Sequence, residues 1–324
     1  MKPSYTYLSP SEWNDKIEKL DALASSCELC PRRCKVNRLN GRRGFCKAPD
    51  HLVISSIFPH HGEEPPISGS RGSGTVFFTY CTLKCCFCQN HQLSHGAEGK
   101  IYSTSALAKE LLNLQAAGCH NINLVTATHF LPWVARVIEE AAADGLTIPI
   151  VYNCGGYELA SVISILSGIV DIYLPDMKYG NNVQADRYSK ASDYVEINRT
   201  AIREMFRQTG PLHLDNEGIA VRGLCIRHLV LPEKAAGSEN IIEFLQKAFD
   251  PHDISISLMA QYKPLFNAHR CAEINRGITF QEYMQVKKKI VDTEFNGFFQ
   301  EMDKLDDGFV IDFKTRKRER LGGD

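Results

Sequence analysis

The hydrophobic residues of this chain alternate between short continuous runs and amphipathic stretches of helical spacing. Six apolar runs predict strands, at 75–78, 121–126, 148–153, 169–174, 224–231 and 254–259. Continuous apolar runs are typical of strands that are buried on both faces of a parallel sheet. The stretches between and after them predict helices, at 103–117, 132–143, 158–166, 183–190, 194–208, 238–249 and 279–296.

This alternation predicts six strand–helix units. Eight such units close a TIM barrel, so six favour an α/β fold with a partial, open (β/α)6 TIM-like barrel. A doubly wound sheet is the alternative. A further helix is predicted at the N-terminus, because Ser9, Pro10 and Glu12 have the spacing of a capping box. An apolar stripe at helical spacing follows it, made of Trp13, Ile17, Leu20 and Leu23.

Composition narrows the class of protein. The chain has 324 residues, 44% of them hydrophobic and 23% charged, as is usual for soluble globular proteins. A net charge of −1 provides no overall field to attract nucleic acid or an anionic membrane, so neither is an expected partner. No apolar run approaches the roughly 18 residues of a membrane span, and the N-terminus lacks the apolar core of a signal peptide. We therefore expect a cytoplasmic protein.

Twelve cysteines are many for a chain in a reducing compartment, where cysteine clusters indicate metal binding or catalysis rather than disulfides. One group has the spacing C-x2-C-x3-C-x11-C and consists of Cys27, Cys30, Cys34 and Cys46. Four thiolates predict a closed metal site, which zinc or a second iron–sulfur cluster would fit equally. The surrounding Lys and Arg residues would stabilise its negative charge, or bind an acidic partner or nucleic acid instead. We expect the scattered cysteines to be buried apolar residues: Cys119, Cys154, Cys225 and Cys271.

The second group, Cys81, Cys85 and Cys88, has the spacing C-x3-C-x2-C. Three thiolates are one fewer than the usual four ligands of a cubane iron–sulfur cluster. They would leave one iron open to a substrate or cofactor. The alternative is a structural zinc loop or a set of buried thiols. Cys86 is an additional thiol in the same loop, and we expect it to be idle.

Residues 51–74 are expected to form an irregular connector, in which the run HHGEEPP at 60–66 is a solvated loop rather than a metal site. We therefore predict that the chain is divided into three segments. Residues 1–70 form an N-terminal helix and cysteine-rich metal-binding module, residues 71–300 form the partial barrel, and residues 301–324 form a C-terminal extension. A last strand is predicted at 309–313, and a solvated basic tail at 314–320.

Polar residues follow the predicted strands where each one ends. In parallel α/β folds the carboxyl ends of strands carry the chemistry, so these residues are expected to converge on the three-cysteine loop. Asp176 and Lys178 are two residues apart and would point the same way, which suits a zwitterionic ligand; the alternative is a surface ion pair. His129 and His228 would be acid–base groups, hydrogen-bonding groups or structural residues. The full set is Thr126, Thr128, His129, Asn153, Asp176, Lys178, His228 and Gln261.

The three-cysteine spacing, with Phe87 before the last cysteine, resembles that of the radical S-adenosylmethionine (radical SAM) superfamily. Several stretches resemble the branch related to pyruvate formate-lyase activating enzyme, among them CELCPRRCKVNRLNGRRGFC, VYNCGGYE, DIYLPDMKY and LMAQYKP. The resemblance implies that Cys81, Cys85 and Cys88 bind a [4Fe-4S] cluster whose open iron holds SAM. Asp176 and Lys178 match the Asp-x-Lys of activases. Residues 126–129 stand where many relatives carry Gly-Gly-Glu.

The implied activity is reductive cleavage of SAM to a 5'-deoxyadenosyl radical that abstracts hydrogen from a substrate. Flavodoxin or ferredoxin would be the electron donor, and a glycyl-radical enzyme is the implied protein substrate. Activases with additional clusters carry the added cysteines after the SAM motif, whereas here they precede it. Radical SAM enzymes that modify a small molecule, peptide or RNA are therefore the alternative. The remaining alternative is a non-catalytic iron–sulfur or zinc-binding protein.

Overall fold

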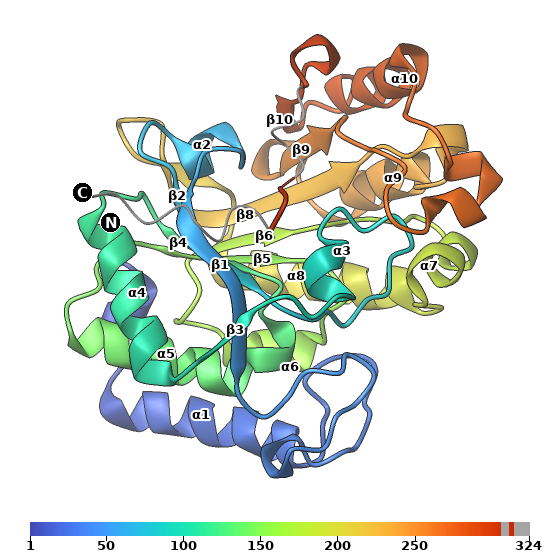
Figure 1. Ribbon diagram of the computed structural model, residues 1–324. Helices are drawn as coiled ribbons and strands as arrows, with labels where there is room; N and C mark the ends of the chain where they lie inside the picture. Colours follow the sequence, from blue (N-terminus) through green and yellow to red (C-terminus); the bar gives the residue numbers. More distant parts are fainter. Residues whose placement is uncertain (306–310, 314–324) are drawn as a thin grey trace.

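One mixed β-sheet organises the computed structural model, which describes residues 1–305 and 311–313 (Figure 1). Its strands lie in the order β10-β9-β8-β6-β5-β4-β2-β1-β3, and β7 pairs with β8. The strands are β1 (Leu52–His60), β2 (Ser73–Phe78), β3 (Lys100–Tyr102), β4 (Ile122–Val125), β5 (Ile150–Cys154), β6 (Ile172–Pro175), β7 (His213–Leu214), β8 (Ala220–Leu229), β9 (Ser255–Met259) and β10 (Asn296–Phe299).

The predicted open partial barrel is confirmed. All six predicted strands form, and they pair in parallel and in chain order as β2, β4, β5, β6, β8 and β9. In the described part of the chain the sheet does not close, because β10 and β3 stand at its two ends. Successive residues of each strand face opposite sides, so Tyr152 packs into the main core while Asn153 faces a cavity.

A seventh parallel strand, β10, was not predicted. The helix expected over 279–296 is wrong in its last turn, because α10 (Phe280–Val291) ends earlier. Glu294 then takes a φ of +65°, and the chain pairs with β9 from Asn296↔Ser255 onward. The predicted strand at 309–313 falls largely outside the described residues, and 311–313 form no strand. The basic tail at 314–320 also lies outside them.

The irregular connector expected at 51–74 is wrong as well. Residues 52–60 form β1, which pairs antiparallel with both β2 and β3, and α2 (Pro65–Ser68) follows. Ser55 and Ser56 interrupt the apolar run of β1 although both are buried. Strand β1 therefore joins residues of the 1–70 segment to the sheet of the predicted barrel.

Several helices cover one face of this sheet, and one of them forms a second layer beneath the others (Figure 1). Helix α4 (Thr104–Ala116) packs on α5 (Leu131–Ala143), and α6 (Ala160–Ile165) packs on α8 (Tyr194–Thr209), while α1 (Pro10–Ser25) packs beneath α5 and α6. The predicted capping box of α1 is confirmed by reciprocal hydrogen bonds between Ser9 and Glu12. The remaining α-helices of the described residues are α3 (His91–Ser94), α7 (Asn182–Ser189) and α9 (Ser238–Ala248). Within the described residues, no helix is both long enough and apolar enough to cross a membrane.

Candidate active site

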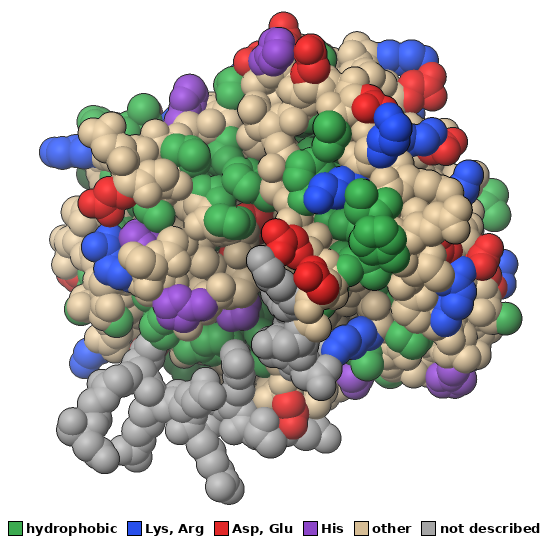
Figure 2. All heavy atoms as spheres, turned by 90° about the horizontal axis from the view of Figure 1, so that it is seen from above, with side chains coloured by type: hydrophobic (Ala, Val, Ile, Leu, Met, Phe, Trp, Pro, Cys, Tyr) green, Lys and Arg blue, Asp and Glu red, His purple; other side chains and the backbone are tan. Residues whose placement is uncertain are grey.

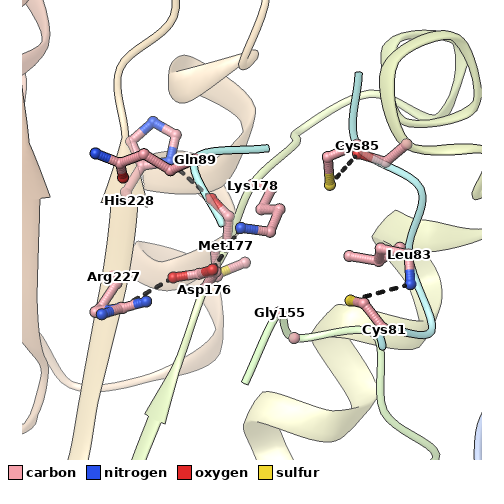
Figure 3. A network of polar contacts seen from close by, with 12 residues as sticks. Cys81, Leu83, Cys85, Gln89, Gly155, Asp176, Met177, Lys178, Arg227 and His228 are labelled. Carbon is pink, nitrogen blue, oxygen red and sulfur yellow. Dashed lines mark hydrogen bonds and ion pairs between the residues drawn. The ribbon is translucent and has the colours of Figure 1, made fainter. Parts of the chain in front are cut away.

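The loop after β2 brings three cysteines to one cavity. Cys81, Cys85 and Cys88 all line a cavity of about 170 Å³ at the carboxyl ends of the parallel strands. Figure 3 shows Cys81 and Cys85 across this cavity from Asp176 and Lys178. Cys86 is not among the residues that line the cavity and interacts with Cys271, and its expected idleness stays a prediction.

Hydrogen-bond donors hold the sulfur atoms. The Leu83 N–H donates to Cys81 Sγ over 3.4 Å, and the Ser189 hydroxyl donates to Cys85 Sγ over 2.9 Å (Figure 3). Burial, and then the charge of Cys85, raises the pKa of Cys81 to about 12 and that of Cys88 to about 11. Three crowded thiolates need a compensating positive group, so this donor set fits a metal cluster.

The opposite wall of the cavity carries a buried ion-pair network (Figure 3). Lys178 Nζ lies 2.5 Å from Asp176 Oδ2, and Arg227 Nε donates to Asp176 Oδ1 over 3.0 Å. The side chains of these three residues are only 10% to 21% exposed, so the alternative of a surface ion pair is wrong. Burial alone would raise the pKa of Asp176, but Arg227 and Lys178 outweigh burial and hold that pKa below its ordinary value.

Two glutamates of the HHGEEPP run extend this network, so the prediction of a solvated loop is wrong for them. Glu63 accepts hydrogen bonds from Arg227 Nη1 (3.2 Å), Asn123 Nδ2 (3.0 Å) and Asn153 Nδ2 (3.4 Å). Glu64 is 7% exposed, and its Oε2 has no hydrogen-bond partner within the described residues. Burial raises the pKa of both carboxyls, against the effect of Arg227.

These glutamates line a second cavity of about 600 Å³, which adjoins the first. The two cavities share several lining residues, among them Asn153, Arg227, Met259 and Gln261. Apolar side chains form part of the wall of the second cavity, among them Phe77, Phe298, Phe299, Leu305 and Ile311, and polar side chains such as Ser257 and Gln300 form the rest. Figure 2 looks onto this end of the molecule, where hydrophobic side chains gather around a few acidic ones.

The structure brings only some of the predicted strand-end residues to the cysteine cavity. Thr126, Asn153 and Gln261 line it together with Asp176 and Lys178. Thr126 adopts a φ of +63°, in the left-handed region that favours glycine. Such strain in a β-branched residue is found mostly at functional sites.

Thr128, His129 and His228 are not brought there. Thr128 donates to Glu158 over 2.8 Å in the core, and His129 Nε2 lies 2.8 Å from the Thr79 carbonyl oxygen. The two ring nitrogens of His228 contact the Met177 carbonyl (2.7 Å) and the Ser238 hydroxyl (2.8 Å). Burial lowers the pKa of His129 to about 3 and that of His228 to about 4, so both rings are neutral at pH 7.

The four N-terminal cysteines lie together beneath the sheet. Cys27, Cys30 and Cys46 are buried, and Cys34 is half-buried. Burial raises the pKa of Cys27 and Cys30, and Cys46 adds to the effect on both. Cys34 Sγ accepts the Phe45 N–H over 3.3 Å. Cys119, Cys154 and Cys225 are buried as expected, whereas Cys271 is only half-buried, so the expectation is wrong for it. No group of three or more His, Cys, Asp or Glu side chains in residues 1–305 and 311–313 is arranged to hold a single metal ion, and the metal at these cysteines stays a prediction.

One arginine joins the two cysteine motifs. Arg32 lies between Cys30 and Cys34 in sequence, and its guanidinium donates to the Thr82 carbonyl over 3.0 Å. It also reaches the Ser189 carbonyl over 3.5 Å and lies 3.9 Å from the centre of the Phe45 ring. The four-cysteine segment therefore packs directly against the loop that carries the other three cysteines.

Sequence reasoning missed four polar residues of the site: Arg32, Glu63, Glu64 and Arg227. Of these, Arg227 carried a usable signal, because it interrupts a buried apolar strand and a buried guanidinium needs carboxylate partners. The glutamates carried none, since a run of charges and prolines between strands is usually a solvated loop.

A scan against protein-family models finds no match. Among curated proteins, the chain is 31% identical over 284 residues to uncharacterized protein MJ0674 of Methanocaldococcus jannaschii. The alignment covers 85% of this chain and 77% of that protein. The chain belongs to the same family. The likeness to the M. jannaschii protein thus extends over most of both chains.

Solved structures provide more distant likenesses. HydG, a maturase of the [FeFe]-hydrogenase, is 13% identical with a TM-score of 0.48, over 68% of this chain and 48% of that one. A radical SAM methyltransferase from Sphaerobacter thermophilus is 12% identical with a TM-score of 0.46, and the match covers 70% of this chain and 65% of that one. Methylornithine synthase (PylB) is 11% identical with a TM-score of 0.41, and the match covers 91% of this chain and 80% of that one. The chain spans about half of the first and about two thirds of the second.

Proposed function

We propose that this protein is a radical SAM enzyme. The observation that carries the proposal is the position of Cys81, Cys85 and Cys88 around one cavity whose opposite wall holds the paired Asp176 and Lys178. The three thiolates would hold a [4Fe-4S] cluster, which, once reduced by one electron from an external donor, would cleave SAM to methionine and a 5'-deoxyadenosyl radical that abstracts hydrogen from a substrate. The adjoining cavity of about 600 Å³ would hold that substrate.

The residues around the cavity have roles that follow from their contacts. The Leu83 N–H and the Ser189 hydroxyl hold two of the sulfurs and stabilise their negative charge. Lys178 lies within the electrostatic reach of Cys85, and its ammonium supplies positive charge from the opposite wall of the cavity. Asn153 and Gln261 offer amide groups to a polar ligand, and the buried position of the cavity limits access of water to a reactive radical.

Anaerobic reconstitution with iron and sulfide tests the proposal. Reduced, cluster-loaded protein is expected to release 5'-deoxyadenosine from SAM, and the Cys88→Ala variant to lose this activity and the cluster absorbance. The matched control is Cys86→Ala, two residues away in the same loop, which should retain both. Absence of 5'-deoxyadenosine from cluster-loaded protein would leave a non-catalytic iron–sulfur protein as the better assignment.

The four N-terminal cysteines are proposed to bind a structural or electron-transferring metal. Their contact with the three-cysteine loop through Arg32 supports a place near the path of the incoming electron. Iron, sulfide and zinc are to be counted in wild-type protein and in the Cys30→Ala variant. Loss of about one zinc per chain assigns zinc, and loss of about four irons with four sulfides assigns a second cluster. Unchanged counts would contradict the proposed site.

The predicted protein substrate, a glycyl-radical enzyme, and the predicted donor, flavodoxin or ferredoxin, remain part of this proposal. Active protein should be incubated with fractions of an anaerobic lysate and followed by electron paramagnetic resonance. A new glycyl signal on a protein supports the activase role. SAM cleavage that depends on an added fraction, with no such signal, would contradict it and favour a small molecule, peptide or RNA substrate.

A further inference from the structure

One oxygen of a buried carboxylate on the wall of the larger cavity has no partner among the described residues. Glu64 is 93% buried, since 7% of its surface is exposed, and it lines the cavity of about 600 Å³. Its Oε2 accepts no hydrogen bond from any residue that the structure describes. Leaving a buried carboxylate oxygen unpaired is costly, so an unpaired oxygen beside a cavity points to a donor that enters the cavity.

The charge balance at the junction of the two cavities points to a cation. Four carboxyl groups line the two adjoining cavities, those of Glu63, Glu64, Asp176 and Glu301, and three cationic groups do so, those of Lys178, Arg227 and Lys263. One negative charge is therefore unmatched when all seven are ionised. Arg227 is bound to Asp176 and Glu63, and Lys178 to Asp176. Glu64 forms no close ion pair with a described residue, although Arg227 attracts it at longer range.

The remaining walls define what the cation is attached to. Phe77, Phe298 and Leu305 form an apolar part of a mixed lining, and a cavity of this volume is in the range of ordinary small-ligand sites. A ligand with an apolar stem and a charged end would bury the stem against these side chains and place its N–H groups at Glu64. Lysine and arginine side chains and free alkylamines share this chemistry.

We propose that Glu64 binds a protonated amine or a guanidinium at the end of an apolar stem, and that this group is part of the substrate. The assignment as substrate rests on the proposed radical SAM function, whereas the cation site itself does not. Glu63, held by Arg227 and two asparagines, keeps the adjoining wall negative without using Glu64.

The test is binding to the full chain as purified, measured by titration calorimetry. The probes are butylamine, butylguanidine, the neutral isostere butanol, and a tripeptide with a central lysine. At least one cationic probe should bind, butanol should bind at least about tenfold more weakly, and Glu64→Gln should lose a similar factor, as expected for a charge-assisted hydrogen bond. The matched control is Glu301→Gln, because Glu301 lines the same cavity but is exposed.

The outcomes separate the two proposals. Equal binding of butanol and the cations, or unchanged binding by Glu64→Gln, overturns the cation site. Weaker binding of SAM rather than of the probes in Glu64→Gln overturns it as well, because Glu64 would then serve the cofactor. Binding that depends on Glu64 in a protein that releases no 5'-deoxyadenosine supports the cation site and contradicts the proposed function. Tighter binding of the tripeptide than of butylamine identifies a polypeptide as the source of the cation, and the reverse order a small molecule.

Discussion

Replacement of Arg227 by methionine tests the buried ion-pair network directly. Methionine has a similar length but no charge, so Arg227→Met removes one partner from both Asp176 and Glu63 while largely filling the space. Removing one partner of a buried ion pair costs about 3–5 kcal/mol, because the other charge stays buried without compensation. Asp176 keeps Lys178, and Glu63 keeps two amide donors, so we expect the loss to lie within this range rather than to double.

The pH dependence of this loss has a definite sign. Without Arg227, burial raises the pKa of Glu63 further above its ordinary value of 4.5. The native variant then keeps a proton that the unfolded chain has released. Glu63 therefore contributes its full stability to the variant below about pH 4.5, the pKa of the unfolded chain. This contribution falls by about 1.4 kcal/mol for each pH unit as the pH rises from that value to the raised pKa of the folded variant. The difference between wild type and variant should thus be larger at pH 8 than at pH 5.5.

The assay is urea unfolding of anaerobically prepared protein, followed by tryptophan fluorescence at both pH values. Arg187→Met is the matched control, because Arg187 forms an exposed ion pair with Glu273 whose loss should cost no more than about 1 kcal/mol. The double variant with Glu63→Gln should recover part of the stability lost in Arg227→Met. A loss below about 1 kcal/mol at pH 8, or a loss that does not shrink at pH 5.5, would refute the reasoning.

Three further predictions concern single side chains. Burial raises the pKa of Glu158 from 4.5 to about 8, so wild-type stability should fall as the pH rises between these values, and Glu158→Gln should remove a slope that totals roughly 5 kcal/mol in urea unfolding. A Cβ at Gly44 would lie 2.8 Å from Cys34 Sγ, so Gly44→Ala should cost about 1–3 kcal/mol and lower the metal content of the purified protein. Ser189→Ala removes the hydroxyl donor to Cys85 Sγ, and a redox titration should find a more negative cluster potential with unchanged iron content.

The sheet was predictable because its central strands are buried on both faces. Such strands are continuous apolar runs, and each is separated from the next by a helix of recognisable period. The four strands that sequence reasoning missed, β1, β3, β7 and β10, lack this signature. Buried serines interrupt β1, and β10 has four residues that follow α10 after only a short turn. Their pairing is decided by the exposed edges of β2 and β9, which no local pattern encodes.

The site was predictable where local spacing or strand ends decide position. Cys81, Cys85 and Cys88 come together because they share one short loop. The rule of strand ends also placed Asn153 and Asp176 correctly, since both lie at the carboxyl ends of their strands. The same rule fails for the two histidines, which do not line the cavity. His129 follows the strand end by a turn that enters α5, and His228 faces away from its neighbour Arg227 because successive residues of a strand point to opposite sides.

The buried arginine shows how more of the site follows from the sequence. An arginine in an otherwise apolar central strand requires carboxylates nearby, and Asp176 alone does not balance both Arg227 and Lys178. At least one further acidic residue had to come from a segment with no assigned place in the sheet. Residues 60–66 are such a segment, and they carry two glutamates in succession. One of them, Glu63, completes the ion pairs of Arg227, which leaves the other free to recognise a ligand.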